Sequence, residues 1–210
     1  MSDTPREVLT AGLRELGLEL TPGQVGQLLA LAELVREWNK KFNLTAIREP
    51  VAMVRKHLLD SLTVARFVAG ATLIDVGSGA GFPGLPLAIA DPDLAVTLVD
   101  STAKKVRFLE HAIGALKLAR VTAVHARAEA FRPDAPAATV VSRALGSLAE
   151  FVRVAGHLCA RGGRLLAMKG KDPKDEVAAL PKGWRVERIE RLKVPGLADE
   201  RHLVILAGRS

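Results

Sequence analysis

From residue 71 onward, short apolar runs alternate with longer segments of helical periodicity. The apolar runs predict strands at 71–76, 95–100, 121–125, 138–142 and 163–168. The periodic segments predict helices at 84–90, 103–118, 147–160 and 173–180. Such alternation is typical of an α/β protein whose parallel sheet has helices on both faces. Residues 184–192 and 201–207 have almost nothing helical between them, which predicts a hairpin whose last strand enters the sheet antiparallel.

The first 70 residues have a different rhythm, with apolar positions at helical spacing and no strand-like run. They predict a helix at 5–18, a second from Pro22 to about Asn39, and a third from Pro50 to about Val68. Thr21 precedes Pro22 as an N-cap, and proline suits the first position of a helix. We therefore expect a helical cap over residues 1–70 and a ligand-binding α/β domain over residues 71–210.

A glycine-rich turn follows the first predicted strand, where Gly77, Gly79 and Gly81 come after Asp75. Glycines tolerate positive φ and let a ligand approach the backbone closely. The next strand ends on Asp100, in the position where a carboxylate can accept hydrogen bonds from a ribose diol. The pattern predicts a site for a ligand that contains a nucleoside.

Two nucleoside ligands fit this turn to different degrees. Residues 79–84 match the dinucleotide pattern G-x-G-x-x-G, a match that any glycine-rich run satisfies easily. An inward-facing Asp75 carboxylate would repel a pyrophosphate and attract the ammonium group of a methionine moiety. The turn also lacks the lysine of a triphosphate loop. These features favour S-adenosylmethionine over NAD, although Asp75 could instead accept hydrogen bonds from the amides of the turn.

Three further segments follow strands, and the carboxyl ends of parallel strands gather around one pocket. Ala128 and Glu129 come after the third strand and could contact an adenine, or Glu129 could be a solvated loop residue. Arg143 ends the fourth strand, where it could bind a phosphate or carboxylate or form a structural ion pair. Lys169 ends the fifth and could contact a phosphate.

Other candidate groups are expected to have structural rather than catalytic or ligand-binding roles. His57 and Asp60 lie within one turn of each other on the third predicted helix, where we expect a hydrogen-bonded pair that supports the domain junction. The single cysteine, Cys159, lies in an apolar pattern and is expected to be a small buried side chain. No histidine and cysteine cluster has the spacing of a metal site, so we predict no metal.

The formal net charge is +7, and nearly all of the surplus lies in residues 142–210. This asymmetry indicates a polyanionic partner such as nucleic acid, unless it is only a basic solvated surface. The sequence has no apolar run long enough to cross a membrane and no secretory signal, so we expect no membrane contact and a cytoplasmic location. The candidate contacts to RNA phosphate are Lys40, Lys41, Arg55, Lys56, Lys169 and Arg201.

Together these motifs resemble the RsmG family, also called GidB, bacterial methyltransferases that modify guanosine at N7 in small-subunit ribosomal RNA. The resemblance covers most of the chain and is looser over about the first fifty residues. It is carried by residues 42–45, 57–61, 74–84, 98–101, 104–109, 142–144, 169–170, 194–195 and 200–204.

The resemblance implies the Rossmann-like fold of class I S-adenosylmethionine-dependent methyltransferases. It implies cofactor contacts at Gly77, Phe82, Ala128, Glu129 and Arg143, to which the residue pattern adds Asp75, Gly79 and Asp100. Phe82 stands where the family often has leucine, and Ala128 where it often has valine. The implied substrate is 16S ribosomal RNA, in the small subunit or an assembly precursor, and we expect a monomer. Guanine N7 carries no proton, so no general base and no catalytic side chain are expected.

Three alternatives remain open at this point. The glycine pattern could serve an NAD-dependent oxidoreductase. The chain could also bind RNA with a pocket that no longer supports catalysis. A methyltransferase that acts on a small molecule or a protein is the third, and the basic C-terminal third argues against it.

Overall fold

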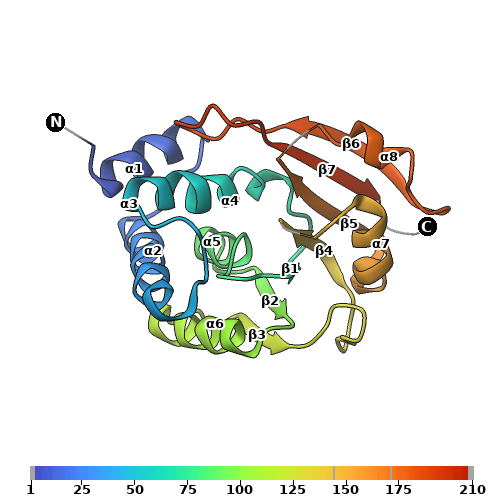
Figure 1. Ribbon diagram of the computed structural model, residues 1–210, viewed down its shortest axis with the longest axis horizontal. Coiled ribbons are helices and arrows are strands. Elements are labelled where there is room, and N and C mark those ends of the chain that lie inside the picture. The colour runs from blue at the N-terminus through green and yellow to red at the C-terminus, as the bar shows by residue number, and fades with distance from the viewer. Residues whose placement is uncertain (1–2, 144, 171, 208–210) are drawn as a thin grey trace.

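The computed structural model describes residues 3–143, 145–170 and 172–207. Its framework is a seven-stranded sheet in the order β3-β2-β1-β4-β5-β7-β6 (Figure 1). The strands are β1 (Thr72–Val76), β2 (Ala95–Asp100), β3 (Val121–His125), β4 (Ala137–Ser142), β5 (Cys159–Lys169), β6 (Arg185–Arg191) and β7 (His202–Ala207).

The first five strands pair in parallel, and β7 pairs antiparallel with both β5 and β6. This arrangement confirms the predicted mostly parallel sheet with a C-terminal hairpin. It also places the ends of β1, β2 and β4 next to one another, because β1 lies between β2 and β4. The strands β2 and β3 are added on one side of β1, and β4 and β5 are added on its other side. Open α/β sheets bind ligands at the point where the strand order changes side in this way.

The longer helices begin within one residue of their predicted starts, and all but α7 end within about three residues of their predicted ends. They are α1 (Pro5–Glu15), α2 (Pro22–Phe42), α5 (Gly84–Ala90), α6 (Ala103–Leu116) and α7 (Leu148–Ala155). Thr4 and Thr21 begin α1 and α2 with capping boxes, in which the threonine hydroxyl and a side chain three residues later satisfy each other's backbone amides. The short helix α8 (Lys174–Val177) covers only part of the predicted segment 173–180.

The predicted continuous helix over residues 50–68 is wrong. The segment is broken into α3 (Pro50–Met53), the π-helix η1 (Val54–Leu59), α4 (Asp60–Leu62) and the 3-10 helix η2 (Ala65–Phe67). The helix predicted over residues 147–160 also ends early, in the 3-10 helix η3 (Gly156–Leu158). Strand β5 begins at Cys159, which pairs with Ala137 of β4, so strand pairing overrides the helical pattern there.

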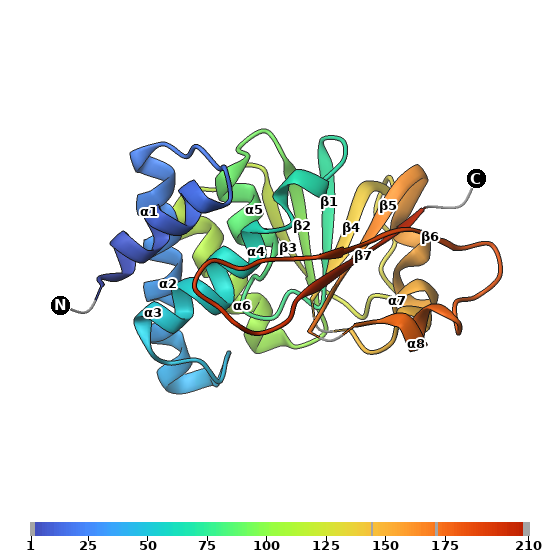
Figure 2. The same cartoon turned by 90° about the horizontal axis from the view of Figure 1, so that it is seen from above.

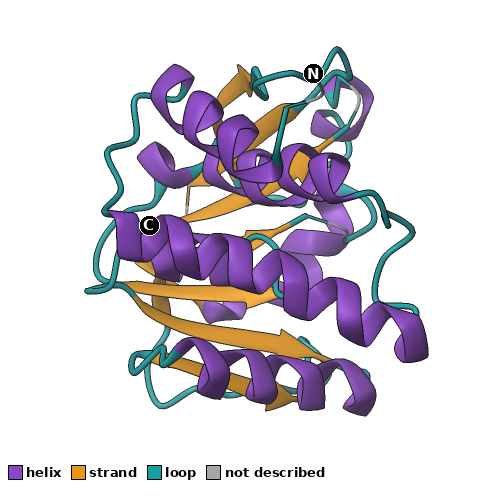
Figure 3. Ribbon diagram, turned by 90° about the vertical axis from the view of Figure 1, so that its left-hand side faces the viewer, coloured by secondary structure: helices purple, strands orange, loops and turns teal. Residues whose placement is uncertain are grey.

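Helices lie on both faces of the sheet (Figure 2). A hydrophobic cluster is buried on each of these faces. One contains Leu28 of the cap, Leu98 of β2 and Phe108 of α6, so the cap and this face of the sheet share a continuous core. Figure 3 looks from the side of these helices, which lie in front of the strands. The other cluster packs Phe151 of α7 against Leu165 of β5. In the part of the chain that the structure describes, no helix is both long and apolar enough to cross a membrane.

Helix α5 packs so closely on the sheet that its first residue must be glycine. A Cβ atom on Gly84 would lie 2.3 Å from Leu98 Cδ2 and 2.8 Å from Asp75 Oδ2. Gly114 of α6, by contrast, has open space around its Cβ position. A substitution by alanine is therefore expected to have opposite effects on stability at these two glycines.

We expect Gly84→Ala to lower the free energy of unfolding by about 1–3 kcal/mol, because the added methyl overfills the contact between α5 and the strands. Gly114→Ala, the matched control, should raise the free energy of unfolding by about 0.5–1 kcal/mol through its higher helix propensity. Urea denaturation of both variants measures the two effects. Equal stability of the two variants would contradict this account of the packing.

Candidate functional site

The glycine-rich segment forms a tight elbow between β1 and α5. Gly77, Gly79 and Gly81 have φ values of 71°, 58° and 86°, a region that other residues enter only with strain. The amides of Gly77 and Ser78 both donate to the carbonyl of Val99, which fixes the elbow against the neighbouring strand. The chain therefore turns away from β1 with almost no side chain above the turn.

Asp100 ties the elbow to the end of β2. Its Oδ2 accepts a hydrogen bond from the Gly79 amide at 2.9 Å, and its Oδ1 accepts one from the Thr102 amide at 2.8 Å. Lys105 lies 3.7 Å from the same carboxylate. An ionised carboxylate has about four lone-pair sites, so Asp100 retains capacity to accept hydrogen bonds from a ligand.

A cavity of about 460 Å³ lies beside this elbow. Four predicted cofactor residues line it, namely Gly77, Asp100, Ala128 and Glu129. The volume falls within the range of roughly 300–1,000 Å³ that is common for small-molecule sites. We call this space the elbow cavity.

Residues after β4 and on α7 complete the wall of the elbow cavity. They include Leu145, Glu150 and Arg153, none of which the sequence singled out. The amphipathic pattern of α7 is a local signal, but its orientation over β4 is tertiary information. Sequence reasoning therefore had no means of finding these residues.

Asp75 lies beneath the elbow rather than in the cavity. Its side chain is fully buried, and its Oδ2 accepts a hydrogen bond from the Gly84 amide at 2.8 Å. The predicted attraction of a methionine ammonium, by direct contact or through water, stays a prediction. The alternative, a carboxylate that binds turn amides, describes the observed position, and the physical reason is that Asp75 faces the first turn of α5.

Phe82 and Arg143 also lie outside the wall of the elbow cavity. The Phe82 ring stacks on the His57 ring with a centroid distance of 4.5 Å and an interplanar angle of 10°. The guanidinium carbon of Arg143 lies 5.3 Å from the centroid of the same ring. The two residues connect the elbow to the helical cap, and their contact with the cofactor stays a prediction.

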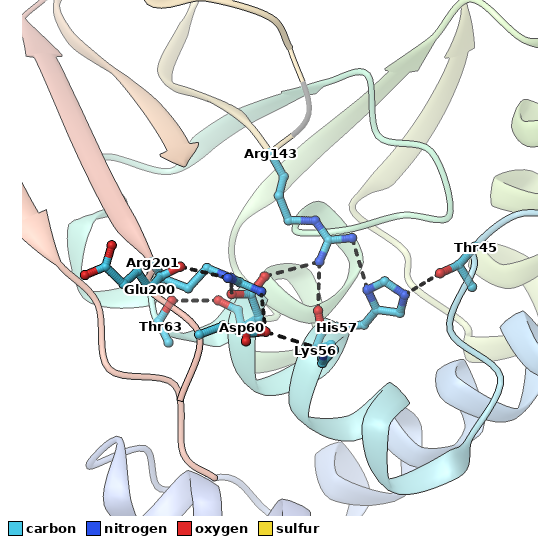
Figure 4. Close-up of polar contacts among 9 residues, drawn as sticks. Thr45, Lys56, His57, Asp60, Thr63, Arg143, Glu200 and Arg201 are labelled. Atoms are coloured by element: carbon cyan, nitrogen blue, oxygen red, sulfur yellow. Dashed lines mark hydrogen bonds and ion pairs between the residues drawn. The ribbon is translucent and has the colours of Figure 1, made fainter. Parts of the chain in front are cut away.

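Arg143 is held by the cap segment through several hydrogen bonds (Figure 4). Its Nη1 donates to the Lys56 carbonyl at 3.2 Å and to Asp60 Oδ2 at 3.3 Å. Its Nη2 donates to His57 Nδ1 at 3.1 Å. Arg201 donates from Nε to the other Asp60 oxygen at 3.1 Å. We call His57, Asp60, Arg143 and Arg201 the Asp60 cluster.

His57 is a neutral member of the Asp60 cluster. Burial and the adjacent Arg143 charge lower the pKa of His57 to about 3. Because a guanidinium can only donate, His57 Nδ1 must accept, and the Nε2–H then donates to Thr45 Oγ1 at 2.8 Å. The expected hydrogen-bonded pair of His57 and Asp60 is not formed between the two described side chains, because each of them is hydrogen-bonded to Arg143 instead.

Asp60 is a buried carboxylate that two arginines share. Burial raises the pKa of Asp60, while the charges of Arg143 and Arg201 oppose that shift. The π-helix η1 positions it, because the Asp60 amide bonds to the Arg55 carbonyl five residues earlier. Such wide turns are frequently found at functional sites.

The predicted contacts to RNA phosphate are in varied surroundings. Lys169 Nζ pairs with Glu176 at 2.8 Å, Lys56 Nζ with Asp199 at 3.4 Å, and Lys40 Nζ with Glu37 at 2.8 Å. Arg201 belongs to the Asp60 cluster. Lys41 is exposed on the last turn of α2. Their role toward RNA stays a prediction.

Arg55 is the remaining predicted phosphate contact, and its Nε is buried with no hydrogen-bond partner among the described residues. Within residues 3–143, 145–170 and 172–207, no group of three metal-ligating side chains is placed to hold a metal ion.

From the burial of Asp75 we predict how the stability of the fold depends on pH. Desolvation raises the pKa of Asp75 from 3.8 to about 7, so the unfolded chain releases this proton first as the pH rises. Wild-type protein should lose stability from this group between about pH 4 and pH 7. Asp75→Asn keeps the shape but removes the titration. The stability of the variant relative to wild type should therefore rise across that window by on the order of 1 kcal/mol or more.

Chemical denaturation of both proteins at pH 5 and pH 8 measures this difference. A stability difference that is the same at both pH values would contradict the assigned burial of the Asp75 carboxylate.

Comparison with known proteins places this geometry in a family. The family model described as "rRNA small subunit methyltransferase G" (GidB) matches residues 24–204. A relative of that name from Pseudomonas aeruginosa is 49% identical over 199 residues, which cover 94% of this chain and 93% of the relative. Another from Nitrosospira multiformis is 46% identical over 209 residues, covering 96% of this chain and 97% of the relative.

Solved structures share the fold at much lower identity. A glycopeptide N-methyltransferase, MtfA, solved in complex with S-adenosylmethionine, has a TM-score of 0.64 and 13% identity, covering 73% of this chain and 88% of that one. At that identity the similarity establishes the fold, which is that of class I S-adenosylmethionine-dependent methyltransferases. The near full-length relatives and the family match show that this chain belongs to the GidB family, the rRNA small subunit methyltransferases G.

Proposed function

We propose that this protein transfers the methyl group of S-adenosylmethionine to N7 of a guanosine in 16S ribosomal RNA. The observation that carries the proposal is the elbow cavity, which Gly77 and Asp100 line in a chain of the GidB family. The basic character of the last third of the chain supports a polyanionic substrate.

The residues of the elbow cavity fit this cofactor. A Cβ on Gly77 would meet no protein atom within 4 Å, so the space above the elbow is free for a ligand. Asp100 can accept hydrogen bonds from a ribose, and Glu129 lies where a carboxylate could accept from an adenine amino group. When bound, S-adenosylmethionine supplies a methyl group on a positively charged sulfonium.

The chain itself is expected to align the reactants rather than to move a proton. Guanine N7 has a free lone pair, so its attack on a methyl carbon requires no general base. His57 is neutral and hydrogen-bonded on both ring nitrogens, which suits a positioning role for Arg143 and Phe82. Fixing nucleophile and electrophile in line and excluding water are then the main contributions to the rate.

The wider partner is the small ribosomal subunit or one of its assembly precursors, with the protein acting as a monomer. Lys40 and Lys41 at the end of α2 and Lys56 on η1 are basic groups on the cap that could contact the RNA backbone. Such contacts position a protein on its nucleic acid without selecting sequence.

The direct experiment incubates the protein and labelled S-adenosylmethionine with undermethylated 16S RNA, and separately with small subunits that contain it. Nuclease digestion and mass spectrometry then identify the modified nucleoside. We expect 7-methylguanosine at one position in at least one of the two substrates. No methyl transfer to either, or binding of NAD in place of S-adenosylmethionine by calorimetry, would refute the proposal.

A matched pair of glycine variants tests the elbow. Gly77→Ala and Gly17→Ala both place a methyl at positive φ, 71° and 68°, with no protein atom within 4 Å. Each should cost about 1–2 kcal/mol of stability. The Gly77 methyl alone projects into the elbow cavity, so Gly77→Ala should weaken S-adenosylmethionine binding by about tenfold or more, which corresponds to ~1.4 kcal/mol.

Isothermal titration calorimetry measures the affinity of both variants. The assignment fails if Gly17→Ala weakens cofactor binding as much as Gly77→Ala does.

A further inference from the structure

A second cavity of about 330 Å³ lies at the ends of β4 and β5, beneath η1. It shares no lining residue with the elbow cavity. The two cavities lie close together along the chain, because Arg143 lines the second and Leu145 lines the first. We call the second space the Asp60 cavity, since Asp60 is in its wall.

The wall of the Asp60 cavity has a surplus of positive charge. Lys56, Arg143, Lys169 and Arg201 line it, whereas Asp60 is the one carboxylate among the described residues of the wall. Two guanidiniums share that carboxylate. Asp199 and Glu176, outside the wall, pair with Lys56, Arg201 and Lys169, so three carboxylates compensate the four cations only in part. Half-buried guanidiniums with spare donors favour a bound anion such as a phosphate.

Apolar side chains form another part of the wall. Ile47, Met168 and Leu192 come from three separate segments and all line the cavity. Apolar side chains of this kind can bury the face of a nucleobase. His202 adds an imidazole to the same wall, and its Nδ1 has no hydrogen-bond partner in the described part of the chain.

The two arginines differ in their relation to the elbow. Arg143 lies over the Phe82 ring at the end of the glycine turn, whereas Arg201 pairs with Asp60 and Asp199. Figure 4 shows the contacts of both arginines with Asp60. A base that lies toward Arg143 would therefore be next to the cofactor, and a phosphate on Arg201 would lie farther from it.

We propose that the Asp60 cavity seats the acceptor nucleotide, with its base against Met168 and Ile47 and its phosphate on Arg201. This inference rests on the proposed methyl transfer to RNA and adds to it the place of the substrate. The transfer then takes place across the end of β4, and Arg143 orients the base beside the cofactor.

Methionine methyl signals report the binding directly. The chain has three methionines, of which Met168 lines the Asp60 cavity and Met53 lies in the core of the cap. Protein labelled with methyl-13C methionine and saturated with S-adenosylhomocysteine is titrated with guanosine 5′-monophosphate, and Met168→Leu assigns the signal. We expect a saturable shift of the Met168 methyl and a fixed Met53 methyl.

Separate probes distinguish a nucleotide from its parts. Guanosine and inorganic phosphate, titrated alone, should each shift the Met168 signal with an affinity at least about tenfold lower than the nucleotide. Arg201→Gln should reduce the nucleotide affinity to that of guanosine. Arg164→Gln is the matched control, because Arg164, in the middle of β5, does not line the Asp60 cavity and forms an exposed ion pair with Glu187.

A bulky variant tests the link to methyl transfer. Ile47→Trp narrows the Asp60 cavity at a partly exposed position, so it should abolish the Met168 shift and the transfer to RNA while leaving S-adenosylhomocysteine affinity within about twofold. Ile189→Trp on β6 is its control, since Ile189 is 38% exposed and lines neither cavity.

The possible outcomes separate the two proposals. A fixed Met168 signal, equal shifts of Met168 and Met53, an equal response to phosphate alone, or normal transfer by Ile47→Trp would each overturn the acceptor assignment. In all these cases wild-type methyl transfer to 16S RNA can still support the proposed function. Absence of cofactor binding and of transfer by the wild type would refute the proposed function itself.

Discussion

The structure around both cavities depends on one buried carboxylate that two guanidiniums share. Asp60 belongs to the helical cap, Arg143 follows β4, and Arg201 directly precedes β7. A buried charge without partners would be costly, so the three segments must meet at this point for the ion pairs to form. The Asp60 cluster thereby fixes the cap over the carboxyl edge of the sheet. Because His57 of this cluster stacks on the Phe82 ring, the cluster also contacts the end of the glycine elbow.

This joint explains why the cap and the sheet share a hydrophobic core instead of meeting at a separable interface. Cap residues such as Leu28 and Leu58 belong to the same cluster as Phe108 beneath the sheet. The elbow cavity and the Asp60 cavity then open on either side of the end of β4. The elbow cavity has carboxylates and cations in equal number in its described lining, whereas cations outnumber carboxylates in the lining of the Asp60 cavity, which suits a polyanionic acceptor there.

The sequence predicted those elements whose signals are local. Apolar runs identified the strands, and the glycines with Asp100 identified the elbow. The π-helix η1 was not predictable, because residues 54–59 have ordinary helical composition and the contacts of His57 and Asp60 with Arg143 join segments far apart in the sequence. The sequence left two positions open for the Asp75 carboxylate, since β1 is buried on both faces and the alternation that would indicate a direction is absent.

Two further features of the site were not predicted from the sequence, because they too depend on packing between separate elements. Arg143 and Lys169 were recognised as strand-end cations, but their partners Asp60 and Glu176 lie on other elements, and sequence spacing says nothing about such pairs. Among the residues after β4, Leu145 and Arg153 line the elbow cavity only because of how α7 packs. What remained outside sequence reasoning was therefore the choice of partners across elements.

A crystal structure of the protein with S-adenosylhomocysteine and guanosine 5′-monophosphate would test the central claim most directly. The account predicts the cofactor product against Gly77 and Asp100, and the guanine on the far side of the β4 end with N7 facing the cofactor sulfur. Density for the cofactor product away from the elbow, or for the nucleotide outside the Asp60 cavity, would contradict it.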